Sequence, residues 1–186
     1  RSFCAFHERR LSTTGERIDD VEMGPFNVGG GLATLLEKAR VSVMKAGTGP
    51  VRGVYGYGET PGTGGLVIMD GPAMSDFVMT GYMAAGVHLM VSTCGAGEGN
   101  RMPFIVGADT PSPVLPALKV SGSTTHSRRK VNRIDFDAGV LAAGAENPER
   151  CGERLANLIL AAASGKAMKT ESRAGFTLNI PVRYYQ

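Results

Sequence analysis

The feature that most constrains the fold is a strand–helix–strand pattern between residues 65 and 92. Residues 65–70 form a short apolar run, residues 74–85 carry apolar side chains at helical spacing, and residues 87–92 are apolar again. A strand, a helix and a strand within about 30 residues are typical of a βαβ unit, whose strands run parallel with a right-handed crossover. The pattern therefore predicts an α/β fold.

Further elements are predicted on both sides of this unit. Apolar residues at helical spacing predict a helix over residues 32–46 with one buried face, which Gly47 ends. Asn147 followed by Pro148 predicts the start of a helix over residues 148–164. Strands are predicted for three more segments, 51–57, 117–120 and 176–184. We expect a layered α/β domain with a largely parallel sheet flanked by helices, and the sheet contains 65–70, 87–92 and 117–120.

Two stretches lack such patterns. Residues 1–26 are polar with mixed charges, and we expect them to be an arm or linker from an upstream domain. Residues 27–186 are then the α/β domain. Residues 95–116 are rich in Gly and Pro and are predicted to form a long loop with one short strand at 104–106. Long loops in compact domains are often functional.

The charge pattern argues against several classes of partner. The formal net charge is only +3, and the densest basic run, Arg128–Lys130, lacks the interleaved aromatic residues typical of nucleic-acid-binding surfaces. No apolar run has the length of a membrane span. The three cysteines are too widely spaced for a disulfide framework or a zinc knuckle. We therefore expect a cytoplasmic protein that binds an acidic small molecule, with no nucleic acid and no membrane as partner.

Two glycine clusters are candidate anion-binding segments. Gly95-Ala-Gly-Glu-Gly99 follows a predicted parallel strand, where backbone N–H groups can form a nest for an anion. A dinucleotide site would need a helix to open directly afterwards, and Arg101-Met-Pro103 begins a helix poorly. Gly29–Gly31 precedes the helix at 32–46, whose N-terminus favours an anion. Asn27 and Thr34 flank this cluster and either cap the helix or bind ligand. For both clusters the alternative is a structural loop.

Ionisable candidates are few and scattered. Asp70 ends a predicted parallel strand, where α/β sheets place their sites. Asp135 and Asp137 flank Phe136, so in an extended chain both face one side and could hold a hard cation. The alternative is that Asp137 caps a following turn. The histidines show no metal-ligand spacing, and His126 is expected in a Ser/Thr-rich loop.

Several segments, in the same order, resemble the altronate/galactarate dehydratase family over residues 27–145. The first is Asn27-Val-Gly-Gly-Gly-Leu-Ala-Thr-Leu-Leu-Glu-Lys38, which is similar to the family's Asn-Lys-x-Gly-Gly-Leu-Thr-Thr-x-x-Glu-Lys. The others are Lys45-Ala-Gly-Thr-Gly-Pro50, Tyr57-Gly-Glu59, Gly65-Leu-Val-Ile-Met-Asp70-Gly-Pro72, Ser92-Thr-Cys-Gly-Ala-Gly97, Pro116-Ala-Leu-Lys119 and Asp135-Phe-Asp-Ala-Gly139.

The resemblance implies an enzyme that eliminates water from a sugar acid such as altronate or galactarate to give a 2-keto-3-deoxy acid. It also implies a divalent metal, iron or manganese. Because this sequence shows no convincing metal-ligand set, we expect the upstream domains of the same enzyme to hold most or all of the ligands. The family also includes a sulfo-lyase that acts on sulfolactate. Whether the chain forms a homo-oligomer stays open.

Individual residues receive roles from these motifs and from the chemistry above. The candidate catalytic groups are Lys119, Asp70 and Lys38, and Lys45 is a further candidate for the base. The candidate substrate-binding residues are Asn27, Gly30, Gly31, Thr34, Thr93, Gly95 and Gly97. Asp135 and Asp137 are the candidate metal ligands.

Two departures from the family's pattern keep other functions open. Ala96 stands where the family has the arginine of Thr-Thr-Gly-Arg-Gly, which would pair with a substrate carboxylate. Val28 stands where the family has lysine. A non-catalytic or regulatory acid-binding domain is therefore one alternative, and a sulfo-lyase is another. A nucleotide-dependent oxidoreductase is supported only by the glycines of residues 95–99.

Overall fold

The chain divides into two compact units, Arg1–Gly49 and Pro50–Gln186. The computed structural model describes Arg9, Ser12, Thr13, Gly15, Val28 and residues 31–71, 75–94 and 114–171. This division leaves the predicted boundary at residue 26 inside the first unit. The strands predicted at 104–106 and 176–184 lie outside the described residues.

Helix α4 (Leu35–Met44) belongs to the first unit and lies within the helix predicted over residues 32–46, beginning three residues after the predicted start. Its start is fixed by a capping box: the Thr34 hydroxyl accepts a hydrogen bond from the Glu37 N–H (3.2 Å). The Glu37 carboxylate in turn accepts from the N–H groups of Ala33 (2.8 Å) and Thr34 (3.2 Å). Thr34 therefore caps the helix, which was one of its two predicted roles.

The buried face predicted for α4 is wrong. None of the helix residues is buried, and Leu36 and Val43 are 77% and 71% exposed. Helical spacing of apolar residues predicts the helix correctly, and the capping box stabilises its start. The spacing does not reveal whether the apolar side of the helix packs against other residues.

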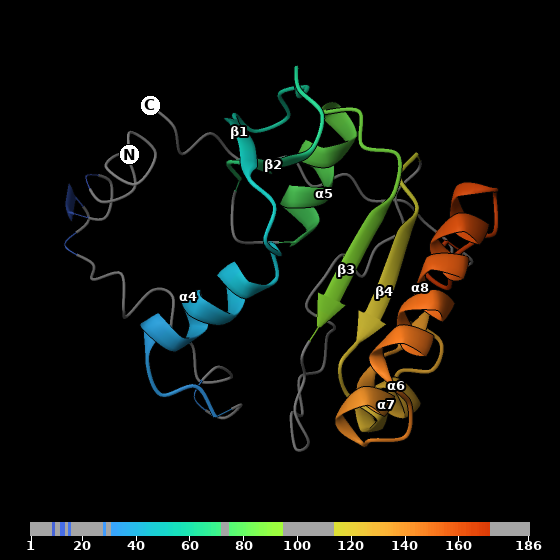
Figure 1. The fold of residues 1–186 in the computed structure, drawn as a ribbon. Helices are drawn as coiled ribbons and strands as arrows, with labels where there is room; N and C mark the ends of the chain where they lie inside the picture. The colour runs from blue at the N-terminus through green and yellow to red at the C-terminus, as the bar shows by residue number, and fades with distance from the viewer. Residues whose placement is uncertain are drawn as a thin grey trace. The chain divides into compact units, whose positions relative to one another are not determined.

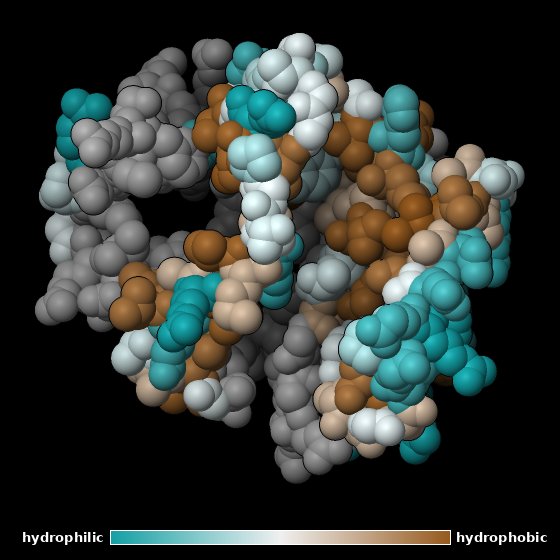
Figure 2. All heavy atoms as spheres, in the orientation of Figure 1, coloured by the Kyte–Doolittle hydropathy of each residue, from teal (hydrophilic) through white to brown (hydrophobic). Residues whose placement is uncertain are grey.

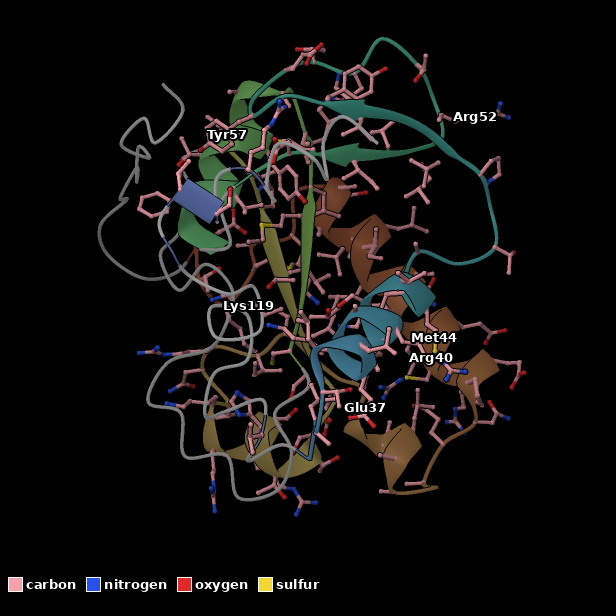
Figure 3. The ribbon with its side chains drawn as sticks, turned by 90° about the vertical axis from the view of Figure 1, so that its left-hand side faces the viewer. Glu37, Arg40, Met44, Arg52, Tyr57 and Lys119 are labelled. Atoms are coloured by element: carbon pink, nitrogen blue, oxygen red, sulfur yellow. The ribbon has the colours of Figure 1, made fainter. Side chains whose placement is uncertain are left out.

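Strands β1 (Val51–Tyr55) and β2 (Leu66–Met69) open the second unit as a two-stranded parallel sheet. Only residues 56–65 connect them, fewer than the dozen or so that a parallel crossover usually needs. Tyr57 in this connection packs against helix α5 at Gly81, where an added Cβ would meet its ring, and its hydroxyl donates to the Phe77 carbonyl (Figure 3).

Helix α5 (Ser75–Ala84) is followed by Gly86, whose φ of +82° suits a glycine, and its bounds agree with the predicted 74–85 to within one residue. Strand β3 (Met90–Cys94) begins three residues later than predicted. The delay has a local cause, because the Val87 N–H still bonds to the Tyr82 carbonyl of the helix (2.9 Å).

Strands β3, β4 (Ala117–Ser121) and β5 (Phe136–Asp137) form a second parallel sheet in that order. The α/β class and the parallel strand direction are confirmed, but the single predicted sheet is divided into two. Strand β2 pairs with β1, whereas β3 pairs with β4. Helix α5 contacts both parts, because Gly81 packs on Tyr57 and Met79 packs in a core cluster with Met90.

Three helices complete the second unit: α6 (Thr124–Arg129), α7 (Gly139–Ala142) and α8 (Pro148–Ala163). Helix α8 has the predicted cap, since the Asn147 side chain accepts from the Arg150 N–H (2.9 Å). The short helices α6 and α7 and strand β5 are not predicted by the sequence patterns. In Figure 1 α8 lies along β4, and α6 and α7 lie at the end toward which the β4 arrow points.

The helices of the described ranges are short or polar. None of them combines the length and the apolar character that a bilayer crossing requires. Figure 2 shows hydrophilic residues gathered on the outer side of α8.

Candidate functional site

The first face of the β3–β4–β5 sheet is apolar and packs against α8. Leu118 and Val120 of β4 and Phe136 of β5 form a core cluster with Cys151 and Ala162 of α8. All five side chains are buried. This face therefore supplies the hydrophobic burial that holds the sheet against its helix.

The second face changes from apolar to polar along the strands. Successive side chains of a strand alternate in direction, so Ala117, Lys119 and Ser121 share the face opposite Leu118 and Val120. Ala117 pairs with Met90 at the start of the strands, in the core cluster that α5 covers. Further along, Lys119 pairs with Ser92, and Ser121 pairs with Cys94 on one side and Asp137 on the other. Polar groups thus gather toward the carboxyl end, where parallel sheets usually place their sites.

Lys119 lies within the central strand of the sheet and is only 1% exposed (Figure 3). Lysine is almost never buried to this degree, because removing an ammonium group from water costs free energy. Its backbone is fixed on the β5 side: the Lys119 N–H donates to Asp135 Oδ2 (2.8 Å), and the Asp135 N–H donates to the Lys119 carbonyl (2.9 Å). The backbone of Lys119 is therefore held within the sheet.

Ser121 ends β4 and organises the turn into α6. Its hydroxyl is fully buried, donates to the Ser123 carbonyl (3.0 Å) and accepts from the Ser123 N–H (3.1 Å). Ser123 then caps α6, because its hydroxyl accepts from the His126 N–H (3.2 Å). These bonds satisfy polar groups that the turn would otherwise bury without partners.

Asp137 ties the start of α6 to the start of α7. Its Oδ1 accepts from the Gly139 N–H (2.9 Å) and from the Thr124 hydroxyl (3.4 Å). The two helix starts are so close that a Cβ on Gly139 would lie 2.1 Å from the Thr124 backbone nitrogen. Gly139 is therefore required for this approach, and the predicted alternative in which Asp137 caps a following turn is confirmed.

The two candidate metal ligands are both engaged with the backbone. Asp135 Oδ2 accepts from the Lys119 N–H, and its Oδ1 accepts from the Lys169 N–H (2.9 Å). Within residues 31–71, 75–94 and 114–171 no three His, Cys, Asp or Glu side chains gather as ligands for a metal. The described residues therefore do not form a fitting site for an iron or manganese ion.

His126 lies in helix α6 and not in the loop that the sequence suggested. The side chain is 7% exposed, and burial lowers its pKa below the ordinary value, with a further contribution from the nearby charges of Lys130 and Arg129. Among the described residues, no group makes a hydrogen bond to its buried Nε2. His126 is thus a neutral buried imidazole close to the polar end of the sheet.

Two further candidates of the second unit do not belong to the Lys119 face of the β3–β4–β5 sheet. Asp70 directly follows β2, in the other sheet, where its N–H donates to the Tyr55 carbonyl (2.8 Å). Thr93 is exposed, and strand alternation places it on the α8 face, opposite Lys119. Ser92 and Cys94, its neighbours in β3, share the Lys119 face instead.

The remaining candidates belong to the first unit or lie outside the described residues. Gly31 has a φ of +93° and donates its N–H to the Val28 carbonyl (3.0 Å), so it closes a turn. Lys38 lies on α4, in the same unit as the capping residue Thr34. Asn27, Gly30, Gly95 and Gly97 lie outside the described residues.

Sequence reasoning missed three polar residues at the carboxyl end of the sheet, Ser121, Ser123 and Thr124, and gave Gly139 no role of its own. The sequence does contain a signal for the serines and the threonine. A buried strand ending in Ser121-Gly-Ser123 followed by two threonines is an N-cap pattern, and its position after a parallel strand directs it to the site edge. No local signal identifies Gly139, since its partner lies on another helix.

Comparison with known proteins now identifies the family. A match to the family described as D-galactarate/altronate dehydratase, C-terminal, spans residues 2–185, and so includes the segment predicted to be an arm. The chain is 36% identical over 143 residues to the galactarate dehydratase (L-threo-forming) of Escherichia coli, covering 76% of this chain and 25% of that protein. It is 31% identical over 147 residues to the altronate dehydratase of Bacillus subtilis, covering 79% and 27%.

A third relative carries a different activity in its name. The chain is 29% identical over 149 residues to the (2R)-sulfolactate sulfo-lyase subunit beta of Chromohalobacter salexigens, covering 78% of this chain and 35% of that protein. The chain therefore spans about a quarter to a third of the length of these relatives. Because the family match covers almost the whole chain, the protein belongs to the D-galactarate/altronate dehydratase family, as a counterpart of its C-terminal region.

Proposed function

We propose that this chain is the C-terminal part of a hydro-lyase that eliminates water from a sugar acid to give a 2-keto-3-deoxy acid. Three relatives named as galactarate or altronate dehydratases support the reaction class. The substrate is then an acidic small molecule. The observation that carries the proposal is the burial of Lys119 on the polar face of the sheet, at the lysine of the family's Pro-x-x-Lys motif.

The reaction needs a group that removes a proton from the carbon beside the substrate carboxylate. The resulting enediolate needs fixed positive or hydrogen-bonding groups, and the departing hydroxyl needs a proton. Lys119 suits either of the first two roles, because its ammonium or amine is shielded from water. Lys38 is less suitable, because it lies on a helix with no buried residues.

The polar end of the sheet offers donors near Lys119 in the same ladder. Ser92 pairs directly with Lys119, and Cys94 follows on the same face. In a parallel sheet, paired residues on one face lie side by side, so a substrate that reaches Lys119 from the carboxyl end passes these groups. We propose that they orient the hydroxyl groups of the sugar acid.

We further propose that the remaining groups come from other parts of the enzyme. The described residues do not supply a metal-ligand set, so an iron or manganese ion used by the reaction would be held mainly by other segments. The chain covers only 25–35% of its relatives' lengths, which supports this division of the site. The 186-residue chain alone should then fold but turn over little substrate.

The test compares this chain with a longer protein that also contains the segments found in its relatives. Galactarate, altronate and (2R)-sulfolactate are supplied separately, with iron or manganese, and formation of the 2-keto acid and release of sulfite are measured. Keto-acid formation by the longer protein, with little by the chain alone, supports the proposal. Sulfite release from sulfolactate, without dehydration of either sugar acid, would instead assign the sulfo-lyase activity. Full dehydratase turnover by the chain alone would refute the divided site.

A non-catalytic acid-binding role is the second candidate, and one observation favours it. Ala96 replaces the arginine of the family's Thr-Thr-Gly-Arg-Gly motif, which removes a bidentate partner for a carboxylate. Binding of galactarate by the longer protein with no turnover of any of the three acids would support this role.

A further inference from the structure

A pocket lies at the start of α8, among residues that the candidate site does not use. Its volume is about 460 Å³, and it is lined by Val140, Ala145, Glu146, Asn147, Arg150 and Arg154. This volume falls within the roughly 300–1,000 Å³ typical of small-molecule sites. Arg154 places the pocket beside the α8 face of the sheet, since its guanidinium lies over the Phe136 ring.

The pocket contains two arginines and one carboxylate. Arg150 and Arg154 lie four residues apart on α8 and so share one side of the helix, and Glu146 lies just before the N-cap Asn147. Glu146 Oε1 lies 3.5 Å from Arg150 Nε and 3.4 Å from Arg154 Nε. Two positive charges thus face a single negative charge, and the cluster keeps an excess of positive charge that favours an anion.

Arg154 is held in position before any ligand arrives. Its guanidinium carbon lies 4.8 Å from the centre of the Phe136 ring, and its Nη2 lies 3.5 Å from the Asp137 carbonyl. Phe136 is itself in the core beneath α8. A side chain that is already ordered loses less conformational entropy on binding, so Arg154 is a pre-organised partner for a carboxylate.

Glu146 offers an acceptor that the described residues do not use. Its side chain is only 11% exposed, and no described group donates a hydrogen bond to its buried Oε2. A buried carboxylate oxygen without a donor costs free energy, so this position favours a ligand that brings an O–H group. A ligand with a carboxylate and a nearby hydroxyl would satisfy both the arginines and this oxygen.

We propose that this pocket is a binding site for a small hydroxylated carboxylate, separate from the Lys119 face. Arg150 and Arg154 bind the carboxylate, and Glu146 Oε2 accepts a hydrogen bond from a hydroxyl of the same ligand. The proposal goes beyond the elimination reaction, because binding here requires neither turnover nor Lys119. It assigns to the molecule a second position that recognises acids.

The test measures binding to the purified 186-residue chain by calorimetry with three matched six-carbon compounds. Galactarate carries carboxylates and hydroxyls, adipate carries only the carboxylates, and galactitol carries only the hydroxyls. We expect galactarate to bind about tenfold or more tightly than adipate, because it adds a hydrogen bond to a charged acceptor. Galactitol should not bind. Equal affinity for galactarate and adipate, or no binding of either acid at millimolar concentration, would overturn the proposal.

Four variants assign the binding to this pocket. Arg154→Gln and Arg150→Gln should each weaken galactarate binding by about tenfold or more, because each removes a charge-assisted hydrogen bond. Arg150 is 77% exposed in its side chain, so its variant is not expected to disturb folding if that of Arg154 does. Arg128→Gln, on an exposed arginine of α6 outside the pocket, is the matched control and should change nothing. Glu146→Ala should abolish the preference for galactarate over adipate.

The variant Lys119→Met distinguishes binding in this pocket from the proposed elimination reaction. It should remove turnover in the longer protein while the isolated chain retains galactarate binding and its sensitivity to Arg150 and Arg154. If binding is lost in Lys119→Met and unaffected by both arginine variants, galactarate occupies the Lys119 face and the second site does not exist. Loss of pocket binding in the arginine variants alone, with the reaction intact, supports the second site.

Discussion

The two faces of strand β4 differ in chemistry although both are buried. Leu118 and Val120 face α8, and Lys119 and Ser121 face the other way, yet all four are less than 10% exposed. On the first face, burial is favourable by itself, because apolar side chains leave water. On the second face, each buried polar group needs compensation, and Ser121 obtains it from the turn into α6. Burial therefore identifies the core, whereas the chemistry of what is buried identifies the candidate site.

The largest expected effect on stability comes from a substitution at the polar end of the second face. Gly139→Ala should lower the free energy of unfolding by more than about 3 kcal/mol, because the new Cβ meets the Thr124 backbone and overpacking against backbone cannot relax easily. Urea denaturation measures the loss. Gly152→Ala is the control, since nothing lies within 4 Å of its added Cβ on α8. Alanine there should stabilise by roughly 0.5–1 kcal/mol. Equal effects at the two positions would show that α6 and α7 do not approach closely.

The next largest effect on stability comes from a substitution on the apolar face. Leu118→Ala should reduce the free energy of unfolding by about 2–5 kcal/mol, because a fully buried side chain leaves a cavity beneath α8. The same substitution at Leu160, which is 65% exposed on α8, should cost less than about 1 kcal/mol in the same urea titration. A small effect at Leu118 would mean that α8 does not pack on this face.

The third substitution, on the polar face, should change the rate of the reaction more than the stability of the fold. Lys119→Met keeps most of the length of the side chain and removes its charge. In the longer protein we expect the rate of elimination to fall by about 10²-fold or more, because a group that acts on the transition state is lost. The midpoint of urea unfolding should shift less than that of Leu118→Ala. Lys166→Met, at an exposed position, is the control for loss of a lysine charge. An unchanged rate in Lys119→Met would return Lys119 to a structural role.

The smallest effect concerns the pH dependence of stability near the polar end. The pKa of His126 is lower in the folded protein than in the unfolded chain, where it is ordinary. As the pH falls below about 6.5, the unfolded chain binds a proton that the folded protein does not, so stability decreases. His126→Gln should therefore lose less stability than the wild type between about pH 7 and about pH 5. His88→Gln, at an exposed position, is the comparison variant. Parallel pH curves for the wild type and His126→Gln would contradict the burial of a neutral imidazole.

The elements with strong local signals could be predicted from the sequence. Helix α8 begins at the expected Asn147-Pro148 cap, and β4 coincides with the strand predicted at residues 117–120. The family resemblance also proved correct, because it rests on motifs spread over most of the chain. Local caps and long motifs depend on neighbouring residues, which is why sequence alone reveals them.

Properties that depend on distant partners could not be predicted in the same way. The sequence places β2 and β3 in one βαβ unit, but their hydrogen-bonding partners are β1 and β4. Thr93 was chosen from a motif, yet strand alternation directs it away from Lys119, and only the register with β4 reveals this. The pocket residues Glu146, Arg150 and Arg154 carry a readable spacing of four, but their relation to Phe136 requires the fold.

The place of β4 between two parallel neighbours also determines how its backbone exchanges with solvent. Its amides are paired toward β3 on one side, and toward β5 and the Asp135 carboxylate on the other, so the sheet must open before deuterium can replace these hydrogens. The two-stranded β1–β2 sheet has no such central strand among the described residues, and Val54 and Ile68 are about half exposed. Mass spectrometry in deuterated water should therefore find the slowest-labelling peptide around Lys119. Lys119, the residue proposed to act in the reaction, would then belong to the segment that opens last. Its surroundings would stay fixed while other parts of the chain fluctuate.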